Sequence, residues 1–148
     1  MRISVKGRYA LAAAVLMAEK TANGGNLTVA CISSELGISK IYLEQVFTQL
    51  KKLGIVTSTK GPKGGYQLAK HPATITAWNI LSALETTLTE ETEETVSEKA
   101  PEMEIVLDEL VFAPLDKAVR EQLNSVTLCQ LCGFEQQQKV DQSFMMGL

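Results

Sequence analysis

The apolar positions of the first fifty residues follow a helical period and are interrupted by short polar or glycine-containing breaks. From Ser4, which can serve as an N-cap, to Glu19, apolar side chains recur every three or four residues in an alanine-rich run. A second, shorter apolar stripe stops at Gly37, a residue typical of the position just past a helix end. The pattern therefore predicts a core helix followed by a short second helix.

A third helix is predicted to begin after Ser39 and to end at Gly54. Its predicted inward stripe is Leu43, Val46, Phe47, Leu50 and Leu53, and its other face carries Lys40, Tyr42, Gln45, Gln49 and Lys52. The tripeptide GIS separates this helix from the one before it. Two helices joined by a glycine-containing turn, the second with a polar outer face, are typical of a helix-turn-helix.

Two short runs, IVTST and GYQLA, flank the stretch TKGPKGG and predict a two-stranded hairpin. Its glycines and Pro62 shape the turn, and Lys60 and Lys63 project from the tip. A hairpin directly after a helix-turn-helix is the element order of a winged helix. The predicted fold class is therefore mainly α with a small β-hairpin wing.

The same loop has two other interpretations. A loop rich in glycine and lysine can cradle a nucleotide phosphate, but such a loop opens a helix, whereas this one leads into a strand and lacks a GK[ST] motif. The second alternative is a hairpin whose lysines serve only solubility. Of the two, it competes more strongly with the interpretation as a wing that contacts DNA.

Charge is divided unevenly along the chain. Residues 1–71 contain ten Lys or Arg and three acids, a formal charge of +7, whereas residues 72–148 contain four Lys or Arg and fourteen acids, a charge of −10. A basic first half fits a polyanion partner. Attraction between the two halves within one globule is the alternative, and charge alone does not distinguish them.

The second half combines a predicted helix, an acidic loop and a long apolar stretch. TITAWNILSALE predicts a helix capped by Thr74 or Thr76, and residues 86–100 are acidic and without apolar periodicity, which predicts a flexible loop. Apolar residues at helical spacing within 102–128, from Ile105 to Leu123, predict a long amphipathic helix with a kink at Pro114. We expect a winged helix-turn-helix domain over 1–85, the flexible loop over 86–100, and a dimerisation helix with a C-terminal helix over 101–148.

The cysteines and the single histidine carry the remaining candidate chemistry. Three cysteines are too few for a secreted disulfide framework, and no apolar run is long enough to span a membrane, so we expect a cytoplasmic protein. His71 follows the wing, where a surface or capping role is expected. Cys129 and Cys132 form a CxxC that could gather a metal or a disulfide in a dimer. Simple packing of the two thiols is the alternative, because no second pair or histidine is nearby.

Three segments, MRISVKGRYAL, GISKIYLEQVFTQLKKLGIV and KGPKGGYQLAK, occur in an order and at a spacing that resemble the bacterial Rrf-type winged-helix transcriptional regulators, typified by IscR, NsrR and CymR. The resemblance covers residues 1–85. It implies a homodimer in which a long helix crosses its partner. It also implies that the wing and third helix bind double-stranded DNA at a pseudo-palindromic operator.

Carried onto this sequence, the resemblance implies DNA contacts from three regions. They are Arg2, Lys6 and Arg8 at the first helix, Ser39, Tyr42, Glu44 and Gln45 on the third helix, and Lys60, Gly61, Lys63 and Gly64 on the wing. The cationic side chains would hold phosphates, whereas Tyr42 and Gln45 can reach base edges. Glu44 either accepts from a cytosine amino group or pairs with Lys40 on its own helix.

In the cluster-binding relatives, the loop after the winged helix supplies three cysteines, but residues 86–100 here contain no cysteine or histidine. We therefore expect no iron–sulfur cluster and a protein closer to the CymR-like members. The expected function is a homodimeric DNA-binding repressor controlled by a regulatory protein or small molecule. The alternative is a redox- or metal-responsive sensor that uses Cys129 and Cys132. With one histidine and no nucleophile–base pair, the sequence does not indicate an enzyme.

Overall fold

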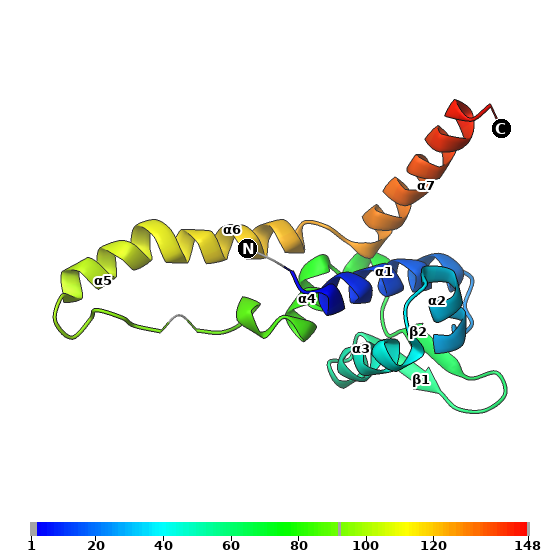
Figure 1. Cartoon of the computed structure of the whole chain (residues 1–148), viewed down its shortest axis with the longest axis horizontal. Helices are drawn as coiled ribbons and strands as arrows, with labels where there is room; N and C mark the ends of the chain where they lie inside the picture. Colours follow the sequence, from blue (N-terminus) through cyan, green and yellow to red (C-terminus); the bar gives the residue numbers. More distant parts are fainter. Residues whose placement is uncertain (1–2, 92, 148) are drawn as a thin grey trace.

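The computed structural model describes residues 3–91 and 93–147 and is mainly helical, with one two-stranded antiparallel sheet. The first half contains the helices α1 (Val5–Lys20), α2 (Val29–Leu36), α3 (Lys40–Lys52) and α4 (Ala77–Leu84) and the strands β1 (Val56–Thr59) and β2 (Gly65–Leu68). The second half contains α5 (Pro101–Leu107), α6 (Ala113–Asn124) and α7 (Leu128–Met145). In Figure 1, α1 to α4 and the hairpin form a body from which α5–α6 and the end of α7 project in different directions. The predicted fold class is confirmed.

Each of the first three helices begins at a side-chain cap. The hydroxyl oxygens of Ser4, Thr28 and Ser39 accept the backbone N–H of the third following residue, at 3.1, 3.1 and 3.2 Å. The second helix ends at Gly37, whose φ of 67° is left-handed. The predicted helix-turn-helix is therefore confirmed as α2 and α3.

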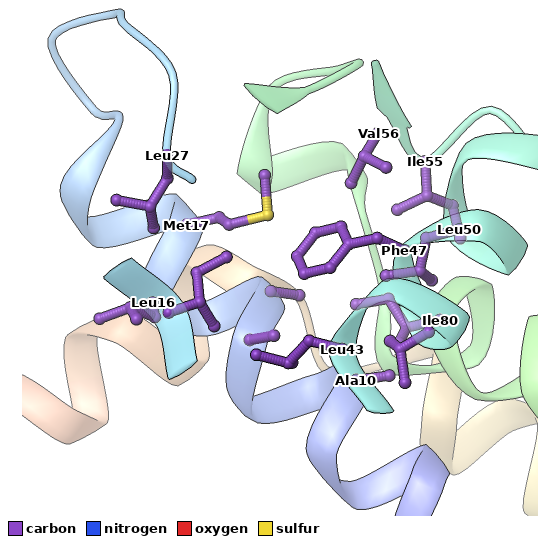
Figure 2. Packing of buried hydrophobic residues seen from close by; sticks show 14 of the residues in the cluster. Ala10, Leu16, Met17, Leu27, Leu43, Phe47, Leu50, Ile55, Val56 and Ile80 are labelled. Carbon is purple, nitrogen blue, oxygen red and sulfur yellow. The ribbon is translucent and has the colours of Figure 1, made fainter. Parts of the chain in front are cut away.

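The core of the body lies between α1 and α3. Ala10, Ala13 and Ala14 of α1 are buried, and their small side chains let α3 approach closely. Figure 2 shows the ring of Phe47 from α3 within this cluster, with Met17 of α1 facing it. Because both side chains are fully buried, the relative position of α1 and α3 is fixed by close packing.

The predicted inward stripe of α3 is correct for all but its last member. Leu43, Val46, Phe47 and Leu50 are fully buried. Leu53 was predicted to be buried as well, but it is 58% exposed. It is the C-cap of α3, where the chain leaves the helical path and turns at Gly54, so the helical period no longer sets its direction.

The hairpin is fixed to the body by a side-chain contact and by backbone hydrogen bonds. As predicted, β1 pairs antiparallel with β2, with Val56 opposite Leu68. The ring of Tyr66 stacks on Phe47, with centroids 4.6 Å apart. Tyr66 and Leu27 also exchange two backbone N–H···O hydrogen bonds of 2.8 Å each. The wing is therefore held by both α3 and the loop between α1 and α2.

The long helix of the second half is continuous but changes its geometry in the middle. A π-helical turn (Asp108–Phe112) joins α5 to α6 and ends two residues before Pro114. A proline has no N–H for the carbonyl four residues earlier, and its ring crowds that carbonyl in a regular α-helix. The wider π turn lies at this point, so the disturbance expected at Pro114 takes the form of a local widening.

Two contacts fix the base of this long helix on the body. The guanidinium of Arg120 in α6 lies over the ring of Trp78 in α4, 4.6 Å from its centroid. The backbone N–H of Ala77 donates to the carbonyl of Val126 at 2.8 Å. The body therefore sets the direction in which α5 and α6 project.

The last helix returns to the body and packs along α1. Leu128, its first residue, is fully buried in the main core, and its N–H donates to the carbonyl of Ile75 at 2.9 Å. The core of the winged helix therefore includes a residue from the predicted 101–148 region. Over residues 3–91 and 93–147, no helix is long and apolar enough to cross a membrane.

The acidic segment 86–100 starts with a short 3₁₀ turn, η2 (Thr86–Leu88), and is attached to α5. The carboxylate of Glu104 accepts the backbone N–H of Val96 at 2.8 Å and that of Thr95 at 3.1 Å. These two hydrogen bonds, the one from Val96 first, lower the pKa of Glu104 below its usual value. Whether the rest of this segment is flexible stays a prediction.

We expect Gly65→Ala to lower the free energy of unfolding by about 3 kcal/mol. At the Gly65 φ of 143° any side chain is strained, and a Cβ would lie 2.8 Å from the carbonyl oxygen of Leu27. Gly25→Ala is the matched control, because Gly25 has a φ of 94° but no atom within 4 Å of the added Cβ. We expect it to cost about 1–2 kcal/mol. Urea unfolding measures both, and equal losses would contradict a tight contact between the hairpin and the loop.

Candidate nucleic-acid interface

The outer face of α3 presents a small set of exposed side chains. Ile41, Glu44 and Gln45 follow one another at helical spacing and are all exposed, Ile41 by 73% although it is apolar. Ser39, exposed at the start of the helix, holds the N–H of Tyr42 with its hydroxyl. An apolar side chain and an amide on one helix face can contact a thymine methyl group and an adenine edge.

Tyr42, which was also expected on this face, is half-buried. Its ring meets the ring of Tyr9 edge-on, with centroids 5.4 Å apart and planes at 81°. The ammonium of Lys6 lies 6.0 Å from the centroid of the Tyr42 ring. Tyr42 thus connects α3 to α1 and holds Lys6 near the start of α3, while its contact with a base edge stays a prediction.

Glu44 is the single acid on this face of α3. Two roles were expected for it, and one of them was an ion pair with Lys40. This ion pair is absent, since the ion pairs among the described residues involve other side chains. Its backbone carbonyl accepts the hydroxyl of Thr48 at 2.7 Å, but its carboxylate is exposed. The carboxylate is therefore available to an external hydrogen-bond donor.

The tip of the wing is a closed turn. The N–H of Gly64 donates to the carbonyl of Gly61 at 2.9 Å, and the side-chain amide of Asn26 donates to the carbonyl of Lys63 at 3.0 Å. Lys60 and Lys63 are exposed. The two lysines are therefore presented by a backbone that is hydrogen-bonded internally and to the preceding loop.

The start of α1 is held by a residue that the sequence did not single out. The carboxylate of Glu85, at the end of α4, accepts the backbone N–H of Ser4 at 2.8 Å and also its hydroxyl. A carboxylate at a helix N-terminus is favourable. Arg8 is exposed in this first turn, whereas Arg2 lies outside the described residues. No local signal could have identified Glu85, because its partner is 81 positions away.

The predicted contact residues within the described part of the chain fall into two groups on the body. Figure 1 shows α3 and the hairpin together at the end of the body that faces away from α7. Lys6 and the exposed residues of α3 form one group, and the wing lysines form the other, with the Phe47–Tyr66 stack between the elements that carry them. The arrangement can hold phosphates on two sides of a helix that contacts bases.

These features define a winged helix-turn-helix protein. The model of the Rrf2 family, described as iron-dependent transcriptional regulators, matches residues 3–133. The chain belongs to the Rrf2 family of transcriptional regulators, as its sequence resemblance indicated, and its named relatives are regulators, not enzymes.

Individual relatives match with different coverage. The HTH-type transcriptional regulator IscR of Escherichia coli is 42% identical over 85 residues, which are 57% of this chain. The match covers 52% of IscR, so the chain spans about half the length of the curated relatives it matches. The structure of CymR (YrzC), the global cysteine regulator of B. subtilis, is similar with a TM-score of 0.72 and 32% identity over 90% of this chain and 98% of CymR. IscR of T. potens has a TM-score of 0.69 and 28% identity, covering 91% of this chain and 88% of that one.

The family description raises the question of whether this chain can hold iron. Iron–sulfur clusters are held by cysteine thiolates, with histidine as the usual replacement. Residues 86–100 contain neither, and the three cysteines lie on α2 and α7. Within the described ranges, no three His, Cys, Asp or Glu side chains converge as metal ligands. Residues 86–100 therefore supply no donor set that fits an iron–sulfur cluster.

The surroundings of the CxxC differ from the expectation. Cys129, Cys132 and His71 line one pocket, so the expectation that no histidine is nearby is wrong. The sequence did not show this because the short turn η1 (Pro72–Thr74), which follows the wing, packs against α7. His71 caps η1, and its Nδ1 accepts the N–H of Ala73 at 3.0 Å, which confirms the predicted capping role.

The Tyr9–Tyr42 contact predicts a measurable coupling. In a double-mutant cycle with Tyr9→Leu and Tyr42→Leu, we expect the free energies of unfolding to be non-additive by about 1 kcal/mol, because each variant removes the same edge-on contact. Tyr9→Leu combined with Tyr66→Leu is the control and should be additive, since Tyr66 stacks on Phe47 instead. Additivity in the first cycle would mean that Tyr42 is not held by α1.

Proposed function

We propose that this chain is a sequence-specific DNA-binding regulator, a repressor, that acts in the cytoplasm as a homodimer on a pseudo-palindromic operator. The observation that supports this most directly is the exposed α3 face beside a lysine-tipped, internally hydrogen-bonded wing at one end of the body. The +7 charge of residues 1–71 adds attraction for a polyanion. The names of its relatives as transcriptional regulators support the same function.

The side chains of the interface would divide the work. Lys6, Arg8, Lys60 and Lys63 neutralise phosphates and give a salt-dependent affinity that is independent of sequence. Gln45, Ile41 and Glu44 supply different chemistry to base edges: an amide for adenine, an apolar surface for the thymine methyl group and an acceptor for the cytosine amino group. Ile41 joins the expected contacts because it is 73% exposed on this face.

The long helix supplies a surface for dimerisation. The α5–α6 rod, residues 101–124, projects from the body. Its apolar side chains are exposed to solvent in the single chain. They are Met103, Ile105, Val106, Leu107, Leu110, Val111, Phe112 and Leu115, exposed by between 37% and 74%. An isolated helix with so much exposed apolar surface requires a partner, and two copies related by a two-fold axis would bury it mutually. A two-fold dimer in turn matches a pseudo-palindromic operator.

The regulatory input is proposed to be a regulatory protein or a small molecule without an iron–sulfur cluster. The acidic segment 86–100 occupies the position of the cluster-binding loop, but it carries carboxylates in place of thiols. Glu85, which directly precedes this segment, accepts hydrogen bonds from Ser4, the N-cap of α1. A conformational change in segment 86–100 would therefore be transmitted to α1 through Glu85.

The wing predicts a specific salt dependence. On a duplex selected from a random pool by the protein itself, Lys60→Gln and Lys63→Gln should each weaken binding and make the slope of log K against log salt shallower by about 0.9, because each removes one phosphate contact. Gel-shift or anisotropy titrations at several salt concentrations measure the slope. Lys117→Gln on α6 is the control and should leave it unchanged. Failure to select any duplex, or slopes unaffected by the wing variants, would contradict the proposed function.

The long helix predicts the oligomeric state. We expect Leu110→Asp to convert the dimer to a monomer, because it places a charge in the apolar surface that two copies would bury. Sedimentation velocity measures the mass, and circular dichroism checks that the body stays folded. Lys117→Asp, which introduces the same residue at a polar position of the rod, should remain dimeric. A wild-type monomer, or a dimer that tolerates Leu110→Asp, would contradict dimerisation through this helix.

A further inference from the structure

A pocket of about 370 Å³ lies between the end of α1, the base of the wing and the start of α7. It brings together residues that are far apart in the sequence: Lys70 and His71 after β2, and Cys129 and Cys132 on α7. Much of the remaining wall is small or apolar. The proposed DNA contacts use none of these residues.

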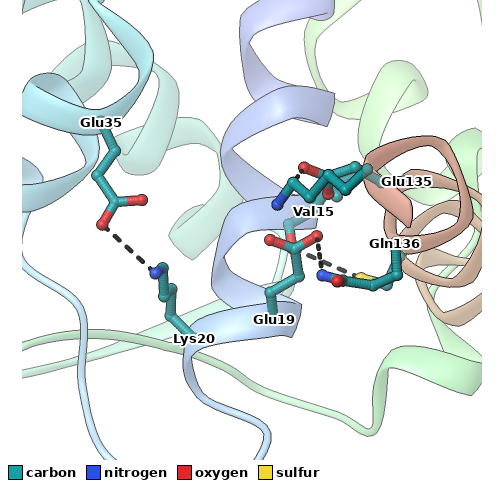
Figure 3. Close-up of polar contacts among 8 residues, drawn as sticks. Val15, Glu19, Lys20, Glu35, Glu135 and Gln136 are labelled. Carbon is teal, nitrogen blue, oxygen red and sulfur yellow. Dashed lines mark hydrogen bonds and ion pairs between the residues drawn. The ribbon is translucent and has the colours of Figure 1, made fainter. Parts of the chain in front are cut away.

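The two thiols occupy different environments within one turn of α7. Cys129 is exposed, whereas Cys132 is half-buried and its thiol donates to the carbonyl of Val15 on α1 at 3.6 Å. In Figure 3 a dashed line joins Val15 to the sulfur atom, drawn in yellow, beside the hydrogen bond from Gln136 to Glu19. Residues three positions apart on a helix have Cα atoms about 5 Å apart, a separation that disulfides span.

The environment of Cys132 favours its protonated form. Burial, followed by the nearby carboxylate of Glu19, raises the pKa of the Cys132 thiol to about 11. Cys132 is therefore sheltered and neutral at physiological pH. An incoming molecule would meet the exposed thiol of Cys129 first.

The charges of the pocket favour an anion. Lys70 is the one charged residue in its lining, whereas the carboxylate of Glu19, which acts on Cys132, is not part of the lining. The Nδ1 of His71 accepts a hydrogen bond from the backbone, so the neutral ring carries its proton on Nε2 and acts there as a donor. The lining of the pocket thus combines one cationic residue, one imidazole and two thiols.

The same hydrogen bond disfavours a metal site. A neutral His71 whose Nδ1 lone pair is engaged and whose Nε2 is protonated has no free lone pair for a metal. The two thiols would then be the only ligands from this pocket, and no group of three ligating side chains occurs among the residues described. Thiol chemistry without a metal is the better fit.

We propose that this pocket is a thiol–disulfide exchange site for small anionic disulfides. The thiolate of Cys129 attacks one sulfur of the bound disulfide RSSR, whose S–S bond breaks, and RS⁻ leaves and takes up a proton. Cys132 then loses its proton and attacks the sulfur of Cys129 in the mixed disulfide, releasing the second RS⁻. The chain's dithiol is oxidised by two electrons to a Cys129–Cys132 disulfide, and the small disulfide is reduced to two thiols.

This reaction would act on the packing between α7 and α1. A disulfide has no S–H, so the hydrogen bond from Cys132 to Val15 is lost when the bond to Cys129 forms. The pocket is also lined by Gln67 and Leu68 at the end of β2, the strand that pairs with β1 in the wing. The site therefore provides an input that goes beyond the proposed DNA binding and is chemically independent of it.

The test compares disulfides of different charge on the reduced full-length protein. The probes are oxidised glutathione (anionic), hydroxyethyl disulfide (neutral) and cystamine (cationic), and each rate of thiol loss is divided by the rate for the same protein in denaturant. We expect the normalised rate to be about fivefold higher for oxidised glutathione than for cystamine. Peptide mapping by mass spectrometry should locate the product bond between Cys129 and Cys132.

Three variants separate a binding pocket from a merely reactive dithiol. Lys70→Gln should slow the reaction of oxidised glutathione about fivefold and leave that of hydroxyethyl disulfide unchanged. Lys117→Gln and Cys31→Ser, both away from the pocket, should behave as wild type. Equal normalised rates for all three probes, no effect of Lys70→Gln, or thiols blocked by zinc or copper in the isolated protein would each overturn the proposal. Because no DNA is present, none of these results bears on the proposed DNA binding.

Discussion

The stack between Phe47 and Tyr66 is the contact on which the geometry of this protein most depends. Phe47 belongs to α3, which would enter the DNA groove, and Tyr66 belongs to the hairpin, which would contact the DNA beside it. Phe47 has no exposed surface and lies against the alanine-lined face of α1. One ring therefore sets α3 against both α1 and the wing. A protein that binds DNA through two elements needs their spacing to be constant, and close packing provides this.

The second half of the chain contributes to the core of the body formed by the first half. Leu128 enters the core of the body, and backbone hydrogen bonds join the segment before α4 to the junction of α6 and α7. The long α5–α6 rod is thus held at its base by residues that also complete the core. If two rods pair, the distance and angle between the two bodies follow from this attachment. The spacing of the two α3 helices in a dimer is therefore determined far from α3.

The sequence predicted the elements that depend on neighbouring residues. The capping serines, Gly37 at the end of α2 and the alternation of the hairpin all act over a few positions, and the structure has them as expected. The features that it did not predict depend on residues distant in the chain. Glu85 reaches Ser4 across the fold, and His71 meets the CxxC only because η1 packs on α7. The helical period predicted that Leu53 would be buried, but Leu53 is exposed because α3 ends there.

The candidate site was predictable to the same extent. The residue types and their elements followed from the pattern and the family resemblance, whereas the half-burial of Tyr42 required the position of Tyr9. That burial changes the physical role of the residue. A tyrosine held between α1 and α3, with Lys6 beside its ring, can act by fixing the position of a cation at the edge of the groove. If α3 binds DNA as proposed, sequence specificity would then rest on exposed residues such as Gln45, Ile41 and Glu44, which the core does not use.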